Sequence, residues 1–439
     1  MLQLTRDIRL ERQVENERFL KNCGITFDDA NKEIALKYLF VNSNILLIYG
    51  AAGTGKTTLI KYISNMYGEA KKLYLTKTHT ALQNVKRYLD NTGENCDFEI
   101  IDSITRSSSI VTHEIVFIDE CSTIDNRTID ILLKKISDNT LLVMSGDIYQ
   151  IESIDFGNWF FYAKDIVKVK GANIELDRTW RTNKEELKSL WNAVRKKSVI
   201  VTEKLSMDGP FSENLGENIF QLDEEEVVLC LNYDGKFGLN NMNQYFQNAN
   251  TNSEAFSWEE WNYKIGDKII FTNTKRSALL YNNLKGTIKN ISYGEKRIIF
   301  EIEVKAFFTE SQCEKEPFEY ISRTENGTII ELDVIAWDDE LSEEEKMRTV
   351  IPFQLAYAIS IHKAQGLEYK SIKVVIPSNN AEKITHSIFY TAITRAKEKL
   401  KIFWSAETMK SVIESFASND VEHRTLSVIK KELEQQGIL

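Results

Sequence analysis

The sequence contains few of the residues and segments that make a chain flexible or membrane-bound. It has only 4 prolines in 439 residues, with no repeat and no serine- or glycine-rich tract, so long flexible linkers are not expected. No apolar stretch approaches the ~20 residues that cross a bilayer. The first residues also lack the apolar core of a signal peptide. We therefore expect a cytoplasmic protein that makes no membrane contact.

Cysteine and net positive charge are also lacking. The 5 cysteines are scattered and form no Cys-x-x-Cys pair, which favours reduced thiols over a disulfide framework or a zinc site. The formal net charge of −10 argues against a protein that coats nucleic acid through its overall field, although a local basic groove is compatible with it. With 439 residues, 42% of them hydrophobic, the chain is long enough for two or three domains.

The most informative segment that is present is the glycine-rich loop at 50–57, which reads GAAGTGKT. It follows the apolar run 45–49 and precedes a helix-like segment, the setting of a phosphate-binding loop. Glycines let successive backbone N–H groups and a helix N-terminus face a phosphate. The pattern predicts a nucleoside triphosphate bound with Mg²⁺, where Lys56 reaches the β/γ oxygens and Thr57 ligates the metal. The expected contacts are Gly50, Gly53, Gly55, Lys56, Thr57 and Thr58.

Two carboxylates follow a second apolar run, 115–118. Open parallel sheets keep their ligands at the carboxyl ends of the strands, so Asp119 and Glu120 are expected beside the phosphate loop. Asp119 would hold Mg²⁺ through water, and Glu120 would orient or deprotonate the attacking water. An Asp-Glu pair after a strand is often only a solvated turn, but the preceding phosphate loop favours the catalytic interpretation.

A third apolar run, 141–144, leads into Gly-Asp-x-x-Gln, and here the sequence resembles motif III of superfamily 1 helicases. In that family the glutamine senses the γ-phosphate, which implies this role for Gln150. The family usually has a proline soon after, whereas this chain reads IESI at 151–154. The resemblance therefore extends to the sensor but not to the turn that follows it.

Segment 73–81 resembles motif Ia of the same family, in the form found in RecD-like members, with Lys77 in place of the usual proline. The resemblance implies that Thr78 and His79 hold the backbone of single-stranded nucleic acid, which hydroxyls and basic groups can do without reading bases. The alternative is a polar helix cap.

Segment 176–182 resembles motif IV, an aromatic residue followed by arginine. The resemblance implies that Trp180 stacks on the nucleotide base and that Arg181 contacts the γ-phosphate. A flat aromatic ring suits a purine, and guanidinium is a fixed fork for phosphate. The alternative is a core tryptophan beside a surface arginine.

Two further matches lie near the carboxyl end. Segment 360–368 resembles motif V, which implies that His362 and Lys363 face the nucleic acid and that Glu368 contacts the nucleotide sugar. Segment 389–396 resembles motif VI, which implies that Arg395 is an arginine finger supplied from a different domain from Lys56. Such a finger neutralises charge on the transferring phosphoryl group and makes hydrolysis depend on domain closure.

The motif order predicts an α/β fold with two RecA-like parallel-sheet domains and a small β-barrel inserted in the second. Alternating apolar runs separated by turn signals, such as 297–304, indicate the barrel, which RecD-like helicases carry at this place. The expected divisions are an N-terminal helical segment at 1–30, a first RecA-like domain at 31–175, a second one at 176–260 and 348–439, and the barrel at 261–347.

The resemblance covers about residues 27–405 and implies an ATP-dependent helicase or translocase of the RecD-like branch. That branch moves 5′→3′ along single-stranded DNA with ATP and Mg²⁺. The alternative is a nucleic-acid-stimulated ATPase that serves as the motor subunit of a larger complex and unwinds little by itself. Phosphate and stacking contacts accept either sugar, so RNA stays open, as does a protein partner.

Two rivals from other classes, a small-molecule kinase or GTP switch and an inactive binding subunit, explain less of the motif set. The chain also departs from the family in two further places. Asn31 stands where the family usually has a longer glutamine that reads adenine. Related motors place a strand-splitting β-hairpin between the segment resembling motif Ib, at 101–104, and the Asp-Glu pair, whereas only 105–114 precede the strand here.

Overall fold

The contacts of the computed structural model divide the chain into two compact units, which we describe separately. Unit 1 contains Met1–Lys204, Ile384–Glu398 and Lys410–Leu439, and unit 2 contains Leu205–Lys383 and Lys399–Met409. The structure describes residues 4–27, 29–89, 95–153, 155–223, 225–251, 254–272, 277, 279–416 and 421–437. Within these ranges, no helix has the length and apolar character needed to span a bilayer.

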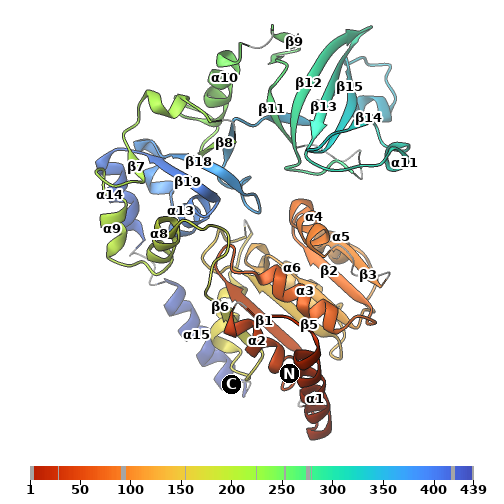
Figure 1. The fold of residues 1–439 in the computed structure, drawn as a ribbon, viewed down its shortest axis with the longest axis vertical. Coiled ribbons are helices and arrows are strands. Elements are labelled where there is room, and N and C mark those ends of the chain that lie inside the picture. The colour runs from red at the N-terminus through yellow and green to blue at the C-terminus, as the bar shows by residue number, and fades with distance from the viewer. Residues whose placement is uncertain are drawn as a thin grey trace. The chain divides into compact units, whose positions relative to one another are not determined.

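Unit 1 is built on a six-stranded parallel sheet with the order β3-β2-β4-β5-β1-β6 (Figure 1). Short apolar runs without alternation form its central strands, as expected for strands buried on both faces. The strands are β1 (Ile45–Gly50), β2 (Lys72–Thr76), β3 (Cys96–Ile100), β4 (Ile115–Ile118), β5 (Leu141–Gly146) and β6 (Asn173–Leu176).

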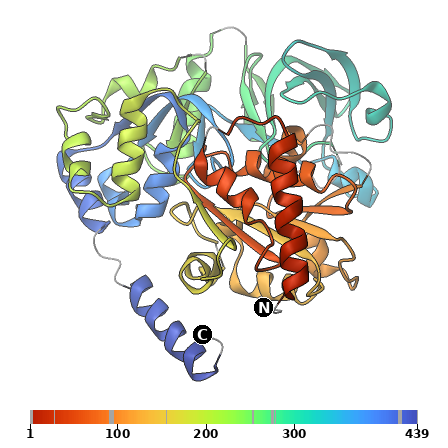
Figure 2. The same cartoon turned by 60° about the horizontal axis from the view of Figure 1, so that its bottom comes forward.

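Helices cover both faces of this sheet (Figure 2). Successive strand residues point to opposite faces, so Leu46 packs in one apolar cluster and Leu47 in the other. The first cluster contains residues of α2 (Ala30–Lys37), α3 (Lys56–Met66) and α4 (His79–Tyr88). The second contains residues of α5 (Ile101–Arg106), α6 (Asn126–Leu133) and α7 (Trp159–Ile166). The result is a three-layer α/β unit.

Two helices far apart in sequence are joined in unit 1. The Nε1 atom of Trp191 in α8 (Glu185–Arg195) donates to Ile393 O in α13 (His386–Ile393) at 3.1 Å. A ring nitrogen of His386 lies 2.8 Å from Val194 O. The other helices of this unit are α1 (Arg6–Asn22), α9 (Ile200–Lys204) and α15 (Val421–Gln435), and α14 (Ala406–Ser415) crosses the boundary between the units.

Unit 2 contains a second sheet, with the order β17-β8-β18-β19-β7. The pairs β17–β8, β18–β8 and β19–β7 are parallel. Phe246 and Met242 of α10 (Leu239–Ala249) pack against Val228 of this sheet in one apolar cluster. The strands are β7 (Ser212–Glu213), β8 (Glu226–Cys230), β17 (Ala358–Ser360), β18 (Tyr369–Val375) and β19 (Ala396–Phe403), the last of which begins in unit 1.

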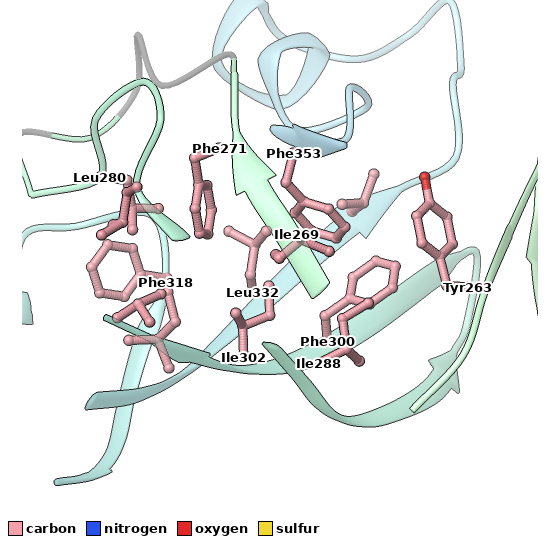
Figure 3. Close-up of a cluster of buried hydrophobic side chains, with 14 of the residues drawn as sticks. Tyr263, Ile269, Phe271, Leu280, Ile288, Phe300, Ile302, Phe318, Leu332 and Phe353 are labelled. Atoms are coloured by element: carbon pink, nitrogen blue, oxygen red, sulfur yellow. The ribbon is translucent and has the colours of Figure 1, made fainter. Parts of the chain in front are cut away.

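Unit 2 also contains a six-stranded antiparallel sheet, with the order β14-β15-β13-β12-β11-β16. Its apolar residues converge on one cluster, where the rings of Phe300 and Phe353 meet edge to face at 5.1 Å (Figure 3). The strands are β11 (Lys268–Phe271), β12 (Lys285–Gly294), β13 (Arg297–Val304), β14 (Glu319–Arg323), β15 (Thr328–Ile335) and β16 (Phe353–Leu355). A separate two-stranded sheet pairs β9 (Phe256–Trp258) with β10 (Trp261–Tyr263). Two short helices, α11 (Glu310–Cys313) and α12 (Glu343–Met347), belong to the same part of the chain.

Asp267 joins the two sheets of unit 2. Its carboxylate is 0% exposed and accepts hydrogen bonds from Gln247 Nε2 in α10 at 2.6 Å and from Tyr357 OH at 2.9 Å. It also accepts from the backbone N–H of Lys264 at 2.8 Å. A buried carboxylate with several donors fixes the segments that supply them, so the antiparallel sheet is held to α10 and to the chain before β17.

The mixed α/β fold with two parallel sheets agrees with the sequence prediction. The two compact units differ from the predicted domains. Residues 384–398 and 410–439 group with unit 1, whereas the sequence assigns 348–439 to the second RecA-like domain. The predicted boundaries stay a prediction.

Candidate functional site

The predicted nucleotide-binding residues of unit 1 lie on four loops, each at the carboxyl end of a strand. The phosphate loop follows β1, Asp119 and Glu120 follow β4, Gln150 follows β5, and Trp180 and Arg181 follow β6. These strands are consecutive in the sheet, in the order β4-β5-β1-β6, and parallel, so their carboxyl ends share one edge. The topology therefore gathers segments that lie up to about 130 residues apart in sequence.

The phosphate loop needs glycine at two positions. Gly53 and Gly55 have φ angles of 73° and 83°, in the left-handed region that residues with a Cβ rarely adopt. A Cβ at Gly53 would lie 2.3 Å from the Cβ of Arg181, so this glycine also allows the loop after β6 to approach. The Lys56 ammonium donates to Gly50 O at 2.9 Å and to Ala51 O at 3.1 Å. Burial lowers the pKa of Lys56, and the carboxylates of the neighbouring loops oppose this shift.

Asp119 and Glu120 form a strained turn at the end of β4. Glu120 has a φ of 56°, and its backbone N–H donates to Asp119 Oδ1 at 2.9 Å. The Ser145 hydroxyl at the end of β5 donates to the same Asp119 oxygen. Burial and the adjacent Asp119 charge raise the pKa of Glu120 to about 7, while Arg395, Lys56 and Arg181 act in the opposite direction. Glu120 is therefore a carboxyl group whose basicity suits proton abstraction near neutral pH.

Gln150 is oriented by the aspartate of its own motif. Its Nε2 donates to Asp147 Oδ2 at 3.1 Å, and Asp147 is 3% exposed. The next residue, Ile151, donates its backbone N–H to Thr391 Oγ1 of α13 at 2.9 Å. The turn that lacks the family's proline is thus tied to the helix that leads to Arg395.

The loop after β6 packs directly on the phosphate loop. Trp180 N donates to Gly53 O at 2.7 Å, and Thr179 Oγ1 donates to Ala52 O at 2.9 Å. The Trp180 ring is 41% exposed, with the Arg178 guanidinium 4.0 Å from its centroid. Because this tryptophan is exposed, the alternative of a core tryptophan is wrong.

Arg395 is buried in unit 1, with 1% of its surface exposed. Its Nε donates to Thr391 O at 3.0 Å, and Arg181 Nη1 donates to the neighbouring Thr394 O at 2.9 Å. The positive charge of Arg395 also acts on the pKa of Glu120. The structure therefore places Arg395 in the same compact unit as Lys56, whereas the resemblance implies a finger from another domain.

The other predicted residues are distributed over both units. Thr78 caps α4 by accepting from Ala81 N at 3.2 Å, which is the geometry of the cap alternative, and both Thr78 and His79 are exposed. Thr58 Oγ1 lies 2.8 Å from Tyr88 OH.

His362, Lys363 and Glu368 lie in unit 2. The Lys363 ammonium donates to Gln354 Oε1 at 2.7 Å, and His362 and Glu368 are exposed. The functional roles of all these residues stay predictions.

Sequence reasoning missed the residues that hold the predicted ones in place. Ser145, Thr179 and Thr391 were given no role, yet each hydrogen-bonds a site loop. Their only signal is a hydroxyl next to a recognised motif. Asn31, at the position where the family usually has an adenine-reading glutamine, donates its Nδ2 to Glu175 O of β6 at 2.9 Å.

Two family models match the chain. The model described as an AAA domain matches residues 29–211, and the model described as a UvrD-like helicase C-terminal domain matches residues 355–402. The first match contains the phosphate loop and all three loops around it. The second contains the segments that resemble motifs V and VI.

Curated relatives match most of the chain at low identity. The RecBCD enzyme subunit RecD of Buchnera aphidicola (subsp. Acyrthosiphon pisum) is 23% identical over 89% of this chain and 75% of its own length. The ATP-dependent DNA helicase Pif1 of Campylobacter jejuni is 24% identical over 79% of this chain and 84% of its own length. An uncharacterized protein of Methanocaldococcus jannaschii is 23% identical over 95% of this chain, which spans 42% of that relative's length.

A solved structure shows the same fold. The Pif1 helicase from Bacteroides in complex with ADP-AlF3 and single-stranded DNA superposes with a TM-score of 0.53, at 14% identity, and the match covers 97% of each chain. At this identity the likeness establishes the fold, two RecA-like parallel-sheet domains.

Proposed function

Because the chain belongs to the RecD- and Pif1-like branch of superfamily 1, whose members are ATP-hydrolysing DNA helicases, we propose that it couples ATP hydrolysis to 5′→3′ movement along single-stranded DNA. The observation that carries this proposal is the convergence of Lys56, Glu120, Gln150 and Arg181 at the carboxyl ends of four consecutive parallel strands. Each of these side chains has the chemistry that phosphoryl transfer to water needs.

The geometry suggests a role for each group. Left-handed glycines turn the loop so that backbone N–H groups at the start of α3 face the β-phosphate, and Lys56 neutralises the phosphate charge. Thr57 and Asp119 supply hard oxygen atoms, which suit Mg²⁺. The metal would draw charge from the phosphate oxygens when bound. Glu120 would orient or deprotonate the attacking water, and Gln150 would sense the γ-phosphate. The exposed Trp180 ring would stack on the base.

The remaining proposals concern nucleic acid and the antiparallel sheet. We assign Thr78 and His79 of unit 1 and His362 and Lys363 of unit 2 to the backbone of single-stranded DNA, and Glu368 to the nucleotide sugar. We assign the six-stranded antiparallel sheet to the small barrel expected between 261 and 347, although it also recruits β16 (Phe353–Leu355). Its apolar cluster gives it a core of its own, as an inserted module requires.

Stimulation of ATP hydrolysis by nucleic acid tests the proposal. We expect single-stranded DNA to raise the turnover of the purified chain at least ~10-fold, because a motor hydrolyses ATP productively only when the strand aligns its two halves. Steady-state ATPase should be measured with single-stranded DNA, duplex DNA and RNA of matched length and salt. A small-molecule kinase or GTP switch would show no response, and an inactive subunit would show no turnover in any reaction. Either result would reject the motor.

The alternative of a motor with little unwinding of its own is favoured by one local feature. The helix α5 ends at Arg106, Val111 makes one isolated parallel bridge with Ile136, and β4 begins at Ile115. Residues 107–114, all of them described, therefore hold no antiparallel hairpin. Two strands and a turn need on the order of 10 residues or more, which leaves no chain to join them to the sheet.

We therefore expect the chain to move on single strands but to separate duplexes poorly. Two measurements under single-turnover conditions decide this: displacement of streptavidin from biotinylated single-stranded DNA, and separation of a 5′-tailed duplex. Displacement should be readily detected while strand separation proceeds at least ~10-fold more slowly, because base pairs must be broken without a wedge. Processive unwinding by the isolated chain at the rate of displacement would show that no wedge is missing. A 3′-tailed duplex is the control for polarity.

A further inference from the structure

Lys32 is a buried lysine beside the phosphate loop that none of the recognised motifs contains. It lies in the first turn of α2 and is 1% exposed. Ala35 and Leu36, three and four residues later, are 2% and 0% exposed and belong to the apolar cluster under the sheet. Residues at this spacing share one helix face, so the side chain of Lys32 leaves α2 on its buried face.

Two neighbours define the position of the Lys32 ammonium. A Cβ placed on Gly55 would lie 2.8 Å from Lys32 Nζ, 3.2 Å from Lys32 Cε and 3.5 Å from Thr58 Oγ1. The same Nζ lies 5.9 Å from the centroid of the Trp180 ring. Lys32 therefore reaches the start of α3 from the side of the loop that carries Trp180. A nucleotide with its phosphates at the N-terminus of α3 and its base on the exposed Trp180 ring would have its α-phosphate and sugar between these two points.

The backbone holds Lys32 in this position. Asp29 caps α2 by accepting from Asn31 N at 2.9 Å, and the Asn31 side chain is fixed to Glu175 O of β6 at 2.9 Å. The first turn of α2 is thus tied to the strand that leads to Trp180. Gly55 has no Cβ, which would otherwise lie 2.8 Å from the ammonium, and its φ of 83° independently favours glycine. Lys32 is preorganised before any nucleotide arrives, which lowers the ordering cost of binding.

We propose that Lys32 is a second nucleotide-binding lysine, which contacts the α-phosphate while Lys56 serves the β- and γ-phosphates. The two ammonium groups approach the loop from different elements, Lys32 from α2 and Lys56 from α3. A cation at the α-phosphate strengthens the binding of ATP, ADP and AMP alike. It does not strengthen the binding of adenosine, which has no phosphate. It contributes equally to the ground state and the transition state, so it affects nucleotide affinity and not the chemical step. The proposal rests on nucleotide binding at this loop and is independent of movement along DNA.

Calorimetric titration of the full chain, without DNA, with ADP, AMP and adenosine tests the assignment. Lys32→Met keeps the length and the apolar stem of the side chain but removes the charge. We expect this substitution to lower the affinity for ADP and for AMP by on the order of 10-fold or more, as for the loss of a hydrogen bond to a charged group. The affinity for adenosine should be unchanged. The kcat for ATP at saturation should stay within about 2-fold of the unaltered chain while KM rises.

Lys72→Met is the matched control. Lys72 is also 1% exposed and lies in the same unit, but its ammonium donates to Gly68 O at 2.8 Å, at the amino end of β2 and away from the site loops. Its replacement should leave all three affinities unchanged. Thermal unfolding of both variants verifies that each is folded. Lys32→Arg keeps the charge and should bind ADP at least several-fold more tightly than Lys32→Met.

Several results would overturn the assignment. ADP affinity that is unchanged in Lys32→Met would show that the ammonium does not contact the nucleotide. If Lys32→Met lost as much affinity for adenosine as for ADP, Lys32 would only support the loop that carries Trp180. Equal ADP affinity in Lys32→Arg and Lys32→Met would exclude a role for the charge. These outcomes would leave ATP-driven movement intact, whereas failure of the unaltered chain to bind ADP at all would reject the nucleotide site together with this assignment.

Discussion

Glu120→Gln should lower ATP turnover at least ~100-fold while ATP binding and single-stranded DNA binding stay near those of the unaltered chain. The amide keeps the shape of the carboxyl group but cannot accept the proton of the attacking water. The structure supports this role, because burial and Asp119 hold the pKa of Glu120 at about 7, close to the pH at which a general base works best. Turnover should be measured with saturating ATP and single-stranded DNA, and binding by titration with a slowly hydrolysed analogue.

Glu114→Gln provides the control for this prediction. Glu114 precedes the same strand, β4, at its amino end, where its Oε2 accepts from Lys71 N at 2.8 Å. An amide oxygen can accept the same hydrogen bond, so turnover should stay within about 2-fold. If Glu120→Gln hydrolysed ATP at a rate near that of Glu114→Gln, the carboxyl group of Glu120 would not be the base.

Arg395→Ala should abolish the hydrolysis that single-stranded DNA stimulates, with a loss on the order of 10³–10⁵ in turnover, the range known for arginine fingers. Nucleotide affinity should change little, because the guanidinium stabilises charge that develops mainly in the transition state. The structure places the arginine 1% exposed in unit 1, with its charge acting on Glu120. Single-turnover hydrolysis and ADP titration separate the two effects.

Loss of a buried arginine can also disturb folding, and Arg12→Ala measures that contribution. Arg12 lies in α1 of the same unit and donates to Phe40 O at 2.6 Å and to Asn44 Oδ1 at 2.9 Å. Arg12→Ala should lower the free energy of unfolding and leave ATP turnover nearly unchanged. Arg395→Lys keeps a positive charge without the planar fork and should recover only part of the rate. The finger assignment would be wrong if Arg395→Ala lost nucleotide affinity while bound ATP still turned over at the normal rate.

The assignment of individual strands and loops followed from local sequence patterns. The apolar runs before Gly50, Asp119 and Gly146 are strands in the structure, because a strand buried on both faces leaves an uninterrupted apolar signature. The glycines of the phosphate loop are equally local, since a left-handed φ can be read from one residue type. Parallel strands then place the four site loops at one edge, which a sequence that alternates strands and helices already implies.

Other features required contacts between distant segments. The antiparallel sheet takes its last strand from Phe353–Leu355, beyond the expected end of the insertion at 347, because pairing with β11 and not local pattern decides where a sheet ends. Arg395 was expected in a different domain from Lys56. Its helix α13 does hydrogen-bond α8, which the sequence assigned to the same predicted domain, but both helices group with the unit that contains Lys56. A helix of 8 residues carries no local signal of which neighbour it packs on.

The sequence by itself was enough to predict a nucleotide site, because Lys56, Thr57, Asp119, Glu120 and Gln150 are recognised by residue type at fixed places after apolar strands. Only the tertiary structure decided what surrounds them. In the folded chain the Asn31 amide hydrogen-bonds Glu175 O, and the Lys32 ammonium lies beside Gly55. The exposed Trp180 ring lies beside the phosphate loop. The physical reason is that a side chain's direction depends on how its helix or loop packs against strands more than a hundred residues away, which no local pattern encodes.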